Sequence, residues 1–301
     1  MRIALVQAWA ALALATLPAS AQLFTLTKEQ LIKITSKNPF ERFDDGRPKV
    51  PDNLMEKVKG LSAEEVWGVL PGAGYPNQYE GNWQLLHPGK KLVGRVVTAQ
   101  FMPVRPDVMD YIDGEMKQRN PLGGPHHQWA IDQLKPGDVI VVDLFGKIDG
   151  GTFVGDNLAT AIFALTKGTG MIVDGGIRDL EGIFPLDMAA YFRGVHPSAI
   201  RGVMMTGFNV PIRVGNATVM PGDLAFGDRE GVYFIPPHLV EQVVDRAEET
   251  HIHDEWTKEK LLTGKYKSIE VYGSPRLPEL KKEYADYLQK KLGRVPAAKK
   301  K

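Results

Sequence analysis

The middle of the chain alternates between strand-like and helix-like patterns, and this alternation is the feature that most constrains the fold. Residues 139–144 form an apolar run of the length of a buried strand. The next segment has apolar residues at helical spacing, with Asp156 as its expected N-cap and Gly168 at its C-terminal end. A second strand is expected at Met171–Val173, followed by a helix around the sequence RDLEGI. Strands that alternate with helices in this way predict an α/β core.

Two further regions predict strands that make the sheet mixed rather than wholly parallel. Residues 91–102, KLVGRVVTAQFM, are rich in β-branched residues and alternate in polarity, which is typical of a strand. Residues 210–237 contain short apolar segments broken by Pro221-Gly222 and by residues 228–231, which predicts hairpins. The sequence PGD occurs at both Pro136 and Pro221, and type II turn chemistry accounts for this without any repeat architecture.

The regions on either side of this core differ from it in composition. Residues 22–60 mix proline, glycine and charge, which indicates an N-terminal extension that wraps onto the body of the protein. Ser62 and Glu65 match a capping box, so a short helix is expected near the start of the main domain, residues 61–250. Residues 251–301 are expected to form a C-terminal helical extension with a basic tail.

The first 21 residues have the layout of a secretory signal peptide. Arg2 precedes an apolar run of about 15 residues, and Ala19-Ser20-Ala21 offers a small-x-small cleavage site. The run is shorter than the roughly 20 residues that a membrane span requires. We therefore expect a periplasmic or secreted protein that begins at Gln22 and has no membrane span after signal removal; an uncleaved anchor is the alternative.

Composition and motif searches exclude several classes of function. The formal net charge of +1 provides no field for binding nucleic acid. The chain has no cysteine, which excludes disulfides, thiolate nucleophiles and cysteine-ligated zinc. No Rossmann fingerprint, P-loop or G-x-S-x-G motif is present, because the glycines of GTGMIVDGG precede the strand and Val173 replaces the third glycine.

The sequence GDNLA at residues 155–159 is the first candidate site. Gly155 followed by Asp156 exposes the first backbone amides of a helix, near Asn157 and Leu158. Such amides form a ready site for a carboxylate or a phosphate. Most helix starts bind nothing, so this pattern by itself leaves both interpretations open.

The sequence MIVDGGIRDL at residues 171–180 is the second candidate site. Gly175-Gly176 is expected to form a tight turn, after which Arg178 and Asp179 begin a helix and can flank a ligand that lies off its N-terminal end. Arg is suited to a carboxylate or an enolate oxygen, and Asp to a hard divalent cation. The alternative is a solvated helix start, with Asp placed favourably near the positive end of the helix dipole.

The histidines are ambiguous by pattern. On a helix, His251 and Glu255 share a face while His253 points elsewhere, which disfavours a two-histidine metal site. A surface or interface role is the alternative for this group. The adjacent His126 and His127 are equally open to either interpretation.

Three blocks of the sequence together resemble the RraA-like family. They are KPGDVIVVD, GDNLATAIFALTKGTGMIVDGGIRDLEGI and PIRVGNATVMPGDLAFGDREGVYFIP, in this order, within residues 61–250. That family includes 4-hydroxy-4-methyl-2-oxoglutarate/4-carboxy-4-hydroxy-2-oxoadipate aldolases and the RraA regulators of ribonuclease E; many members were once mislabelled as demethylmenaquinone methyltransferases. The resemblance implies a compact α/β/β sandwich of the swivelling type with a mixed sheet, assembled as a homotrimer or hexamer.

The resemblance also implies a chemistry and a set of site residues. Asp179 would hold Mg²⁺ or Mn²⁺, mostly through water, and Arg178 would bind the substrate's oxygens. The amides of the helix start at residues 155–158 would receive the carboxylate of pyruvate. The implied enzyme is a metal-dependent lyase that acts on a small 2-oxo acid, by retro-aldol cleavage of a 4-hydroxy-2-oxo acid or by oxaloacetate decarboxylation. Both reactions leave a pyruvate enolate, and Asp156 is the candidate base nearest in sequence.

The chain departs from the family pattern in several places. The aldolases also use an acidic residue from a neighbouring subunit, for which Asp254 and Glu255 are the candidates here. A histidine often found before the sequence KPGD aligns with Gln128, one position from His127. The competing hypothesis is a periplasmic binding or regulatory protein that keeps the fold without turnover. Methyl transfer to a quinone has no support, since no glycine-rich nucleoside pocket is present.

Overall fold

The computed structural model describes residues 25–293, so the predicted signal peptide and the end of the basic tail lie outside the described residues. The main sheet has strand order β1-β11-β10-β3-β4-β5-β6-β2, and β7 pairs with β3. The strands β3, β4, β5 and β6 pair in parallel, whereas the contacts of β1, β2, β7, β10 and β11 are antiparallel. The predicted mixed sheet is therefore confirmed.

The strands lie close to where their patterns predict them, and β4 and β5 are buried along their whole length. Their bounds are β1 Tyr79–Glu80, β2 Gln84–Leu85, β3 Leu92–Pro103, β4 Asp138–Asp143, β5 Gly170–Ile177, β6 Ala189–Val195, β7 Val203–Phe208, β8 Ile212–Val214, β9 Ala217–Val219, β10 Leu224–Gly227 and β11 Val232–Ile235. The helices are α1 Lys28–Ile34, α2 Asp52–Lys59, α3 Ala63–Trp67, α4 Pro106–Arg119, α5 His126–Asp132, α6 Asp156–Thr166, α7 Leu180–Ile183, α8 Val240–Leu262, α9 Ser268–Val271 and α10 Pro278–Leu292, with short 3₁₀ turns at Pro71–Ala73 and Pro237–Leu239.

The sheet is covered on both faces, which gives the α/β/β layering that the family resemblance implies. On one face, buried side chains of α4, α5, α6 and α7 pack against β3 to β7 in the largest core cluster. On the other face, the β8–β9 hairpin packs against β3, β4 and β5. Because both faces of β4 are covered, its sequence is continuously apolar rather than alternating.

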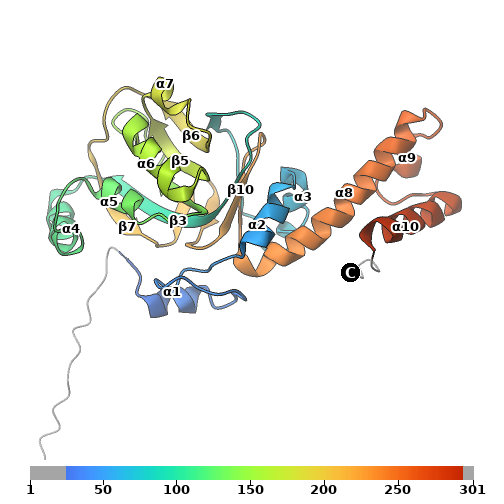
Figure 1. The fold of residues 1–301 in the computed structure, drawn as a ribbon, viewed down its shortest axis with the longest axis horizontal. Coiled ribbons are helices and arrows are strands. Elements are labelled where there is room, and N and C mark those ends of the chain that lie inside the picture. Colours follow the sequence, from blue (N-terminus) through green and yellow to red (C-terminus); the bar gives the residue numbers. More distant parts are fainter. Residues whose placement is uncertain (1–24, 294–301) are drawn as a thin grey trace, which may run out of the picture.

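The helices outside this sandwich extend from one end of the sheet. Helices α2, α3 and the first turns of α8 bury their apolar residues against β10 and β11. The predicted capping box is present, since the Ser62 hydroxyl accepts from the Glu65 amide and the Glu65 carboxylate accepts from the Ser62 amide. Helix α8 then runs away from the sheet and packs with α9 and α10 around Trp256 (Figure 1). None of the helices within residues 25–293 has the length and hydrophobicity of a membrane span.

The Gly175-Gly176 pair does not form the tight turn expected from the sequence. Both glycines lie inside β5, which continues to Ile177, and neither has positive φ. A Cβ at Gly175 would lie 2.8 Å from the Leu144 Cβ, and one at Gly176 would lie 3.1 Å from the Ile148 carbonyl oxygen. The glycines are needed because the connection after β4 passes so close to β5 that no side chain fits there. A close approach of this kind and a tight turn both favour glycine, so the sequence pattern does not distinguish them.

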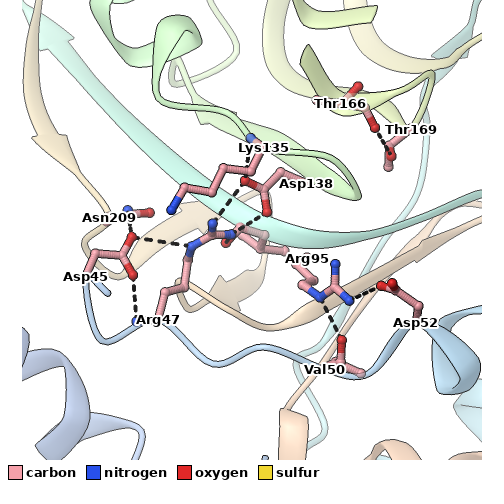
Figure 2. Close-up of polar contacts among 11 residues, drawn as sticks. Asp45, Arg47, Val50, Asp52, Arg95, Lys135, Asp138, Thr166, Thr169 and Asn209 are labelled. Carbon is pink, nitrogen blue, oxygen red and sulfur yellow. Dashed lines mark hydrogen bonds and ion pairs between the residues drawn. The ribbon is translucent and has the colours of Figure 1, made fainter. Parts of the chain in front are cut away.

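The N-terminal extension is attached to the sheet by a buried ion pair. Both terminal nitrogens of Arg47 donate to the Asp138 carboxylate, at 2.7 and 3.0 Å, and Arg47 also donates to the Val96 carbonyl (Figure 2). Asp138 opens β4 and also accepts from the Lys135 amide across the first PGD turn. Arg47 is 1% exposed and Asp138 is fully buried, while the Phe43 ring lies 4.4 Å from the guanidinium carbon. This contact joins the extension to the start of a central strand.

We expect Arg47→Ala to destabilise the protein by about 3–5 kcal/mol, because it leaves the Asp138 carboxylate buried without its counter-charge. Urea unfolding followed by circular dichroism measures the change. Arg105→Ala is the matched control, since Arg105 pairs with Asp107 on the surface. An Arg47→Ala midpoint equal to that of the control would contradict the anchoring role.

Candidate functional site

Backbone pairing brings the two candidate segments of the sequence together. The Phe153 amide donates to the Gly176 carbonyl at 2.9 Å, and the Arg178 amide donates to the Val154 carbonyl at 3.0 Å. Residues 152–155 thus lie along the carboxyl end of β5, and the start of α6 lies beside α7 (Figure 1). Gly155 and the Arg178-Asp179 pair are adjacent as a result, although more than 20 residues separate them in the sequence.

Arg178 and Asp179 form an ion pair at the end of β5. Arg178 Nη1 lies 3.0 Å from Asp179 Oδ2, and the two side chains are 37% and 36% exposed. Asp179 has a left-handed backbone, with φ 58° and ψ 43°, and is the N-cap of α7. Its carboxylate does not cap that helix, unlike most N-cap aspartates, and contacts Arg178 instead. The prediction that the pair begins a helix is confirmed to within one residue: β5 ends at Ile177, Asp179 is the N-cap, and α7 starts at Leu180.

Two glycines let the charged side chains approach the backbone. A Cβ at Gly155 would lie 2.2 Å from Asp179 Oδ2 and 3.2 Å from Arg178 Cζ. A Cβ at Gly182 would lie 2.7 Å from the Asp156 Cβ and 2.9 Å from its Oδ2. Contacts under 3.0 Å are not compatible with a side chain at these positions. Gly182 was not singled out from the sequence, because nothing in its local pattern marks a close approach.

Asp156 occupies the first helical position of α6, not the N-cap expected from the sequence. Gly155 is the N-cap, and its carbonyl accepts the first helical hydrogen bond from Ala159. Asp156 Oδ1 accepts instead from the Asn157 amide at 2.8 Å. The amides of Asp156 and Leu158 belong to the first turn, where an N–H group has no acceptor four residues earlier within the helix. The helix start therefore presents both amides and a carboxylate.

A cavity of about 630 Å³ contains most of these groups. Its polar side is formed by Arg178 and by residues 155–158 at the start of α6. Asp179 is not among the lining residues, but its carboxylate contacts Arg178, which is, and lies against the Gly155 backbone. The other walls come from β3, α4, α5, the connection between β6 and β7, and β7. A cavity of this size is typical of small-molecule sites, which range over about 300–1,000 Å³.

The histidine pair His126-His127, left open by the sequence, lines the same cavity. His126 Nε2 lies 3.1 Å from Asp113 Oδ1, whereas the buried His127 ring packs 5.9 Å from the Phe153 ring. Burial is the main cause that lowers the pKa of His127 to about 4, and protonation of the adjacent His126 at low pH contributes a smaller lowering. Burial also lowers the pKa of His126, and Asp113 opposes that shift. Both rings are therefore uncharged at neutral pH.

The acids predicted to come from a neighbouring subunit lie far from this cavity within one chain. Asp254 and Glu255 belong to the part of α8 that extends away from the sheet, at the opposite end from α6 and α7 (Figure 1). Asp254 pairs with His253, and Glu255 accepts from Lys291 on α10 at 2.8 Å. His251 lies near Glu65 on α3. A contribution of these acids therefore requires a second copy of the chain.

Two carboxylates, Asp156 in the cavity lining and Asp179 beside Arg178, are the acidic groups nearest to the predicted metal position. Within residues 25–293 no cluster of three or more histidine or acidic side chains has the arrangement of a metal site. Asp179 and Asp156 nevertheless contact the backbone of neighbouring α6 and α7 residues beside the cavity. Mg²⁺ keeps most of its water ligands and needs only one or two carboxylates, so this donor set suits Mg²⁺ or Mn²⁺ better than a metal that requires a closed site.

Comparison with known proteins identifies the family. The model of the RraA-like family, described as Aldolase/RraA, matches residues 69–234, which is more than half of the chain. The chain belongs to the RraA-like family. The matched residues include all of Gly155 to Asp179, and the match ends before α8. This confirms the resemblance found in the sequence.

Individual RraA-like proteins share limited identity with the chain. A putative 4-hydroxy-4-methyl-2-oxoglutarate aldolase of Halalkalibacterium halodurans is 33% identical over 146 residues, which span 48% of this chain and 67% of that protein. Protein DlpA of Legionella pneumophila is 27% identical over 219 residues, 70% of this chain but only 32% of DlpA. The crystal structure of Streptomyces coelicolor RraAS2, an unusual member of the RNase ES inhibitor RraA protein family, superposes with a TM-score of 0.56 at 24% identity, over 74% of this chain and all of that one. It supports the fold.

We expect the His127 imidazole to remain neutral from about pH 5 to pH 8, with a midpoint near 4, because burial opposes its charge. Histidine proton chemical shifts recorded by NMR against pH measure this midpoint, with His127→Gln used for assignment. The pKa of His127 in the folded protein lies below the ordinary value of 6.5. Its contribution to the free energy of unfolding is therefore fully present above pH 6.5 and is lost as the pH falls towards 4. His127→Gln should therefore unfold with a weaker pH dependence over that interval. A midpoint near 6.5 would show that the ring is solvated.

Proposed function

We propose that this protein is a divalent-metal-dependent lyase that releases pyruvate from a small 2-oxo acid. The reaction is retro-aldol cleavage of a 4-hydroxy-2-oxo acid, decarboxylation of oxaloacetate, or both. One observation carries the proposal: Arg178 and the amide-bearing start of α6 line the same cavity, with Asp179 held against both. The aldolase description of the family model and of the Halalkalibacterium halodurans relative supports the same class of reaction.

The cavity suits the pyruvate half of such a substrate. The amides at the first turn of α6 and the positive end of its dipole favour a bound carboxylate. Arg178 lines the same side of the cavity and would donate to the keto oxygen as negative charge develops on it. Oriented donors of this kind lower the energy of an enolate more than that of the starting ketone.

Asp156 is the proposed general base. Its Oδ1 accepts from the Asn157 amide, so Oδ2 remains available to accept a proton. In the retro-aldol direction the C4 hydroxyl gives its proton to Asp156, directly or through water, and the C3–C4 bond breaks. The C4 fragment leaves as an aldehyde or ketone, and the electron pair stays with C3 as the enolate. Protonation at C3 then gives pyruvate.

Asp179 is the residue that would hold the divalent cation. When bound, Mg²⁺ or Mn²⁺ supplies positive charge beside the substrate oxygens that become negative in the reaction. The ion pair fixes the Asp179 carboxylate beside Arg178 and leaves its second oxygen outside that contact. No lysine lines this cavity among the described residues, so a Schiff-base route is not proposed.

Assembly and location complete the proposal. We propose that the chain forms a homotrimer or hexamer in which Asp254 or Glu255 of one copy reaches the cavity of the next. Both acids are on the helix that extends beyond the sheet (Figure 1), so a neighbouring copy could be reached without a change of fold. The sequence of residues 1–21 supports export to the periplasm or the medium.

Asp179→Ala should lower pyruvate release from oxaloacetate or a 4-hydroxy-2-oxo acid by on the order of 10²–10³, since it removes the proposed metal ligand. Pyruvate formation is measured with Mg²⁺ or Mn²⁺ present. Asp107→Ala, on the exposed face of α4, is the control and should retain wild-type rates. Unchanged release by Asp179→Ala would refute the assignment. Binding of pyruvate or oxalate without turnover of any 2-oxo acid would instead favour a binding protein.

Gly155→Ala should inactivate the protein while keeping its fold, because the added methyl group would occupy the place of the Asp179 carboxylate. We expect at least a tenfold loss of pyruvate release with an unchanged circular dichroism spectrum. Gly114→Ala is the matched control: it lies within α4 and its Cβ would meet nothing within 4 Å. That change should preserve activity and slightly stabilise the helix. Equal activity in the two variants would show that the reaction does not require the Asp179 carboxylate to lie against the Gly155 backbone.

A further inference from the structure

The cavity at Arg178 has a polar side and an apolar side. The apolar side chains come from β3, α4, the connection between β6 and β7, and β7; they are Phe101, Met109, Ile200, Val203, Met204 and Met205. All six are buried or half-buried. With the pyruvate half of a 4-hydroxy-2-oxo acid at the start of α6, as proposed above, its C4 substituent would extend towards these apolar side chains.

The charged side chains that line the cavity can neutralise one carboxylate of a substrate but not a second one. Of the described residues that line it, Arg178 is the one arginine or lysine, while Asp113 and Asp156 supply two carboxylates. Arg201, on the neighbouring loop, pairs with Asp149 at 3.0 Å and does not line the cavity. His126 and His127 are neutral at physiological pH because burial lowers both pKa values.

A second carboxylate at the C4 end of a substrate would therefore lose its hydration without gaining a counter-charge. Such a group would lie near Asp113 and among methionine and aliphatic side chains, where an unpaired anion is strongly disfavoured. An alkyl group in the same place would be removed from water and would contact apolar side chains on several sides. Methionines at two successive positions of β7, Met204 and Met205, can adapt to substituents of different shape.

We propose that this protein prefers 4-hydroxy-2-oxo acids with a single carboxylate and an uncharged, apolar C4 substituent over those with a second carboxylate. This selectivity rests on the proposed function and concerns the same cavity. Cleavage of such a substrate breaks the C3–C4 bond, transfers the hydroxyl proton to the protein, and yields pyruvate and an apolar aldehyde or ketone. No oxidant or further reactant is required.

The test compares two substrates of equal chain length with the wild-type protein and Mg²⁺ or Mn²⁺. These are 4-hydroxy-2-oxoheptanoate, which ends in a methyl group, and 4-hydroxy-2-oxoheptanedioate, which ends in a carboxylate. Pyruvate release gives kcat/KM for each, and we expect the ratio to favour the heptanoate at least tenfold. Equal values, or a preference for the heptanedioate, would overturn the selectivity while the lyase function stands. If the protein releases pyruvate from neither of these compounds and not from oxaloacetate either, the proposed function is refuted instead.

Ile200→Arg tests the physical cause of this selectivity. Ile200 is half-buried in the connection before β7, where a long cationic side chain can reach the cavity from its rim. The variant should shift the ratio of kcat/KM towards the heptanedioate by at least tenfold. Ile200→Met changes the side chain without adding charge and should keep the wild-type preference. Leu262→Arg adds the same charge on the exposed end of α8 and should also keep it. If Ile200→Arg leaves the ratio unchanged, charge at the apolar wall does not determine selectivity.

Discussion

Two backbone hydrogen bonds, between Phe153 and Gly176 and between Arg178 and Val154, hold the candidate site together. They extend the parallel sheet by a few residues of irregular chain at the carboxyl end of β5. Apart from the acid proposed to come from a neighbouring copy, every functional group of the proposed mechanism lies on one of the two paired segments or on the first turn that follows it. A strand end is suited to this role because its backbone is fixed by its neighbours, whereas the side chains beyond it are free to face a ligand.

The close pairing of these segments also restricts which residues can stand there. Gly155 and Gly182 have no side chain because carboxylates occupy that space, and Asp179 adopts a left-handed backbone at the same point. Strained or unusual backbone that persists at a cavity is characteristic of functional sites. The rest of the sandwich supplies the rigidity. Its central strand β4 begins at the buried Arg47–Asp138 ion pair, so the N-terminal extension contributes to the stability of the domain that carries the site.

Much of the fold was accessible from local pattern. Apolar periodicity located β3, β4 and α6, and turn chemistry located the two PGD turns, because these signals depend on a few neighbouring residues. The errors share one cause. Gly175 and Gly176 were assigned to a turn and Asp156 to an N-cap, since glycine and aspartate serve several local purposes that only the packing distinguishes. Glycines that admit a distant segment, such as Gly182, carry no local signal at all.

The sequence by itself determined the family and the mixed α/β core, and it indicated the two segments, 155–158 and 178–179, that form the candidate site. These follow from short-range order in the chain and from motifs that are contiguous. Only the tertiary structure decided that the two segments share one cavity, that the neutral pair His126-His127 faces them, and that the remaining wall is apolar. The charge and shape of that wall come from strands and helices far apart in the sequence, so they exist only once the sheet has brought those elements together.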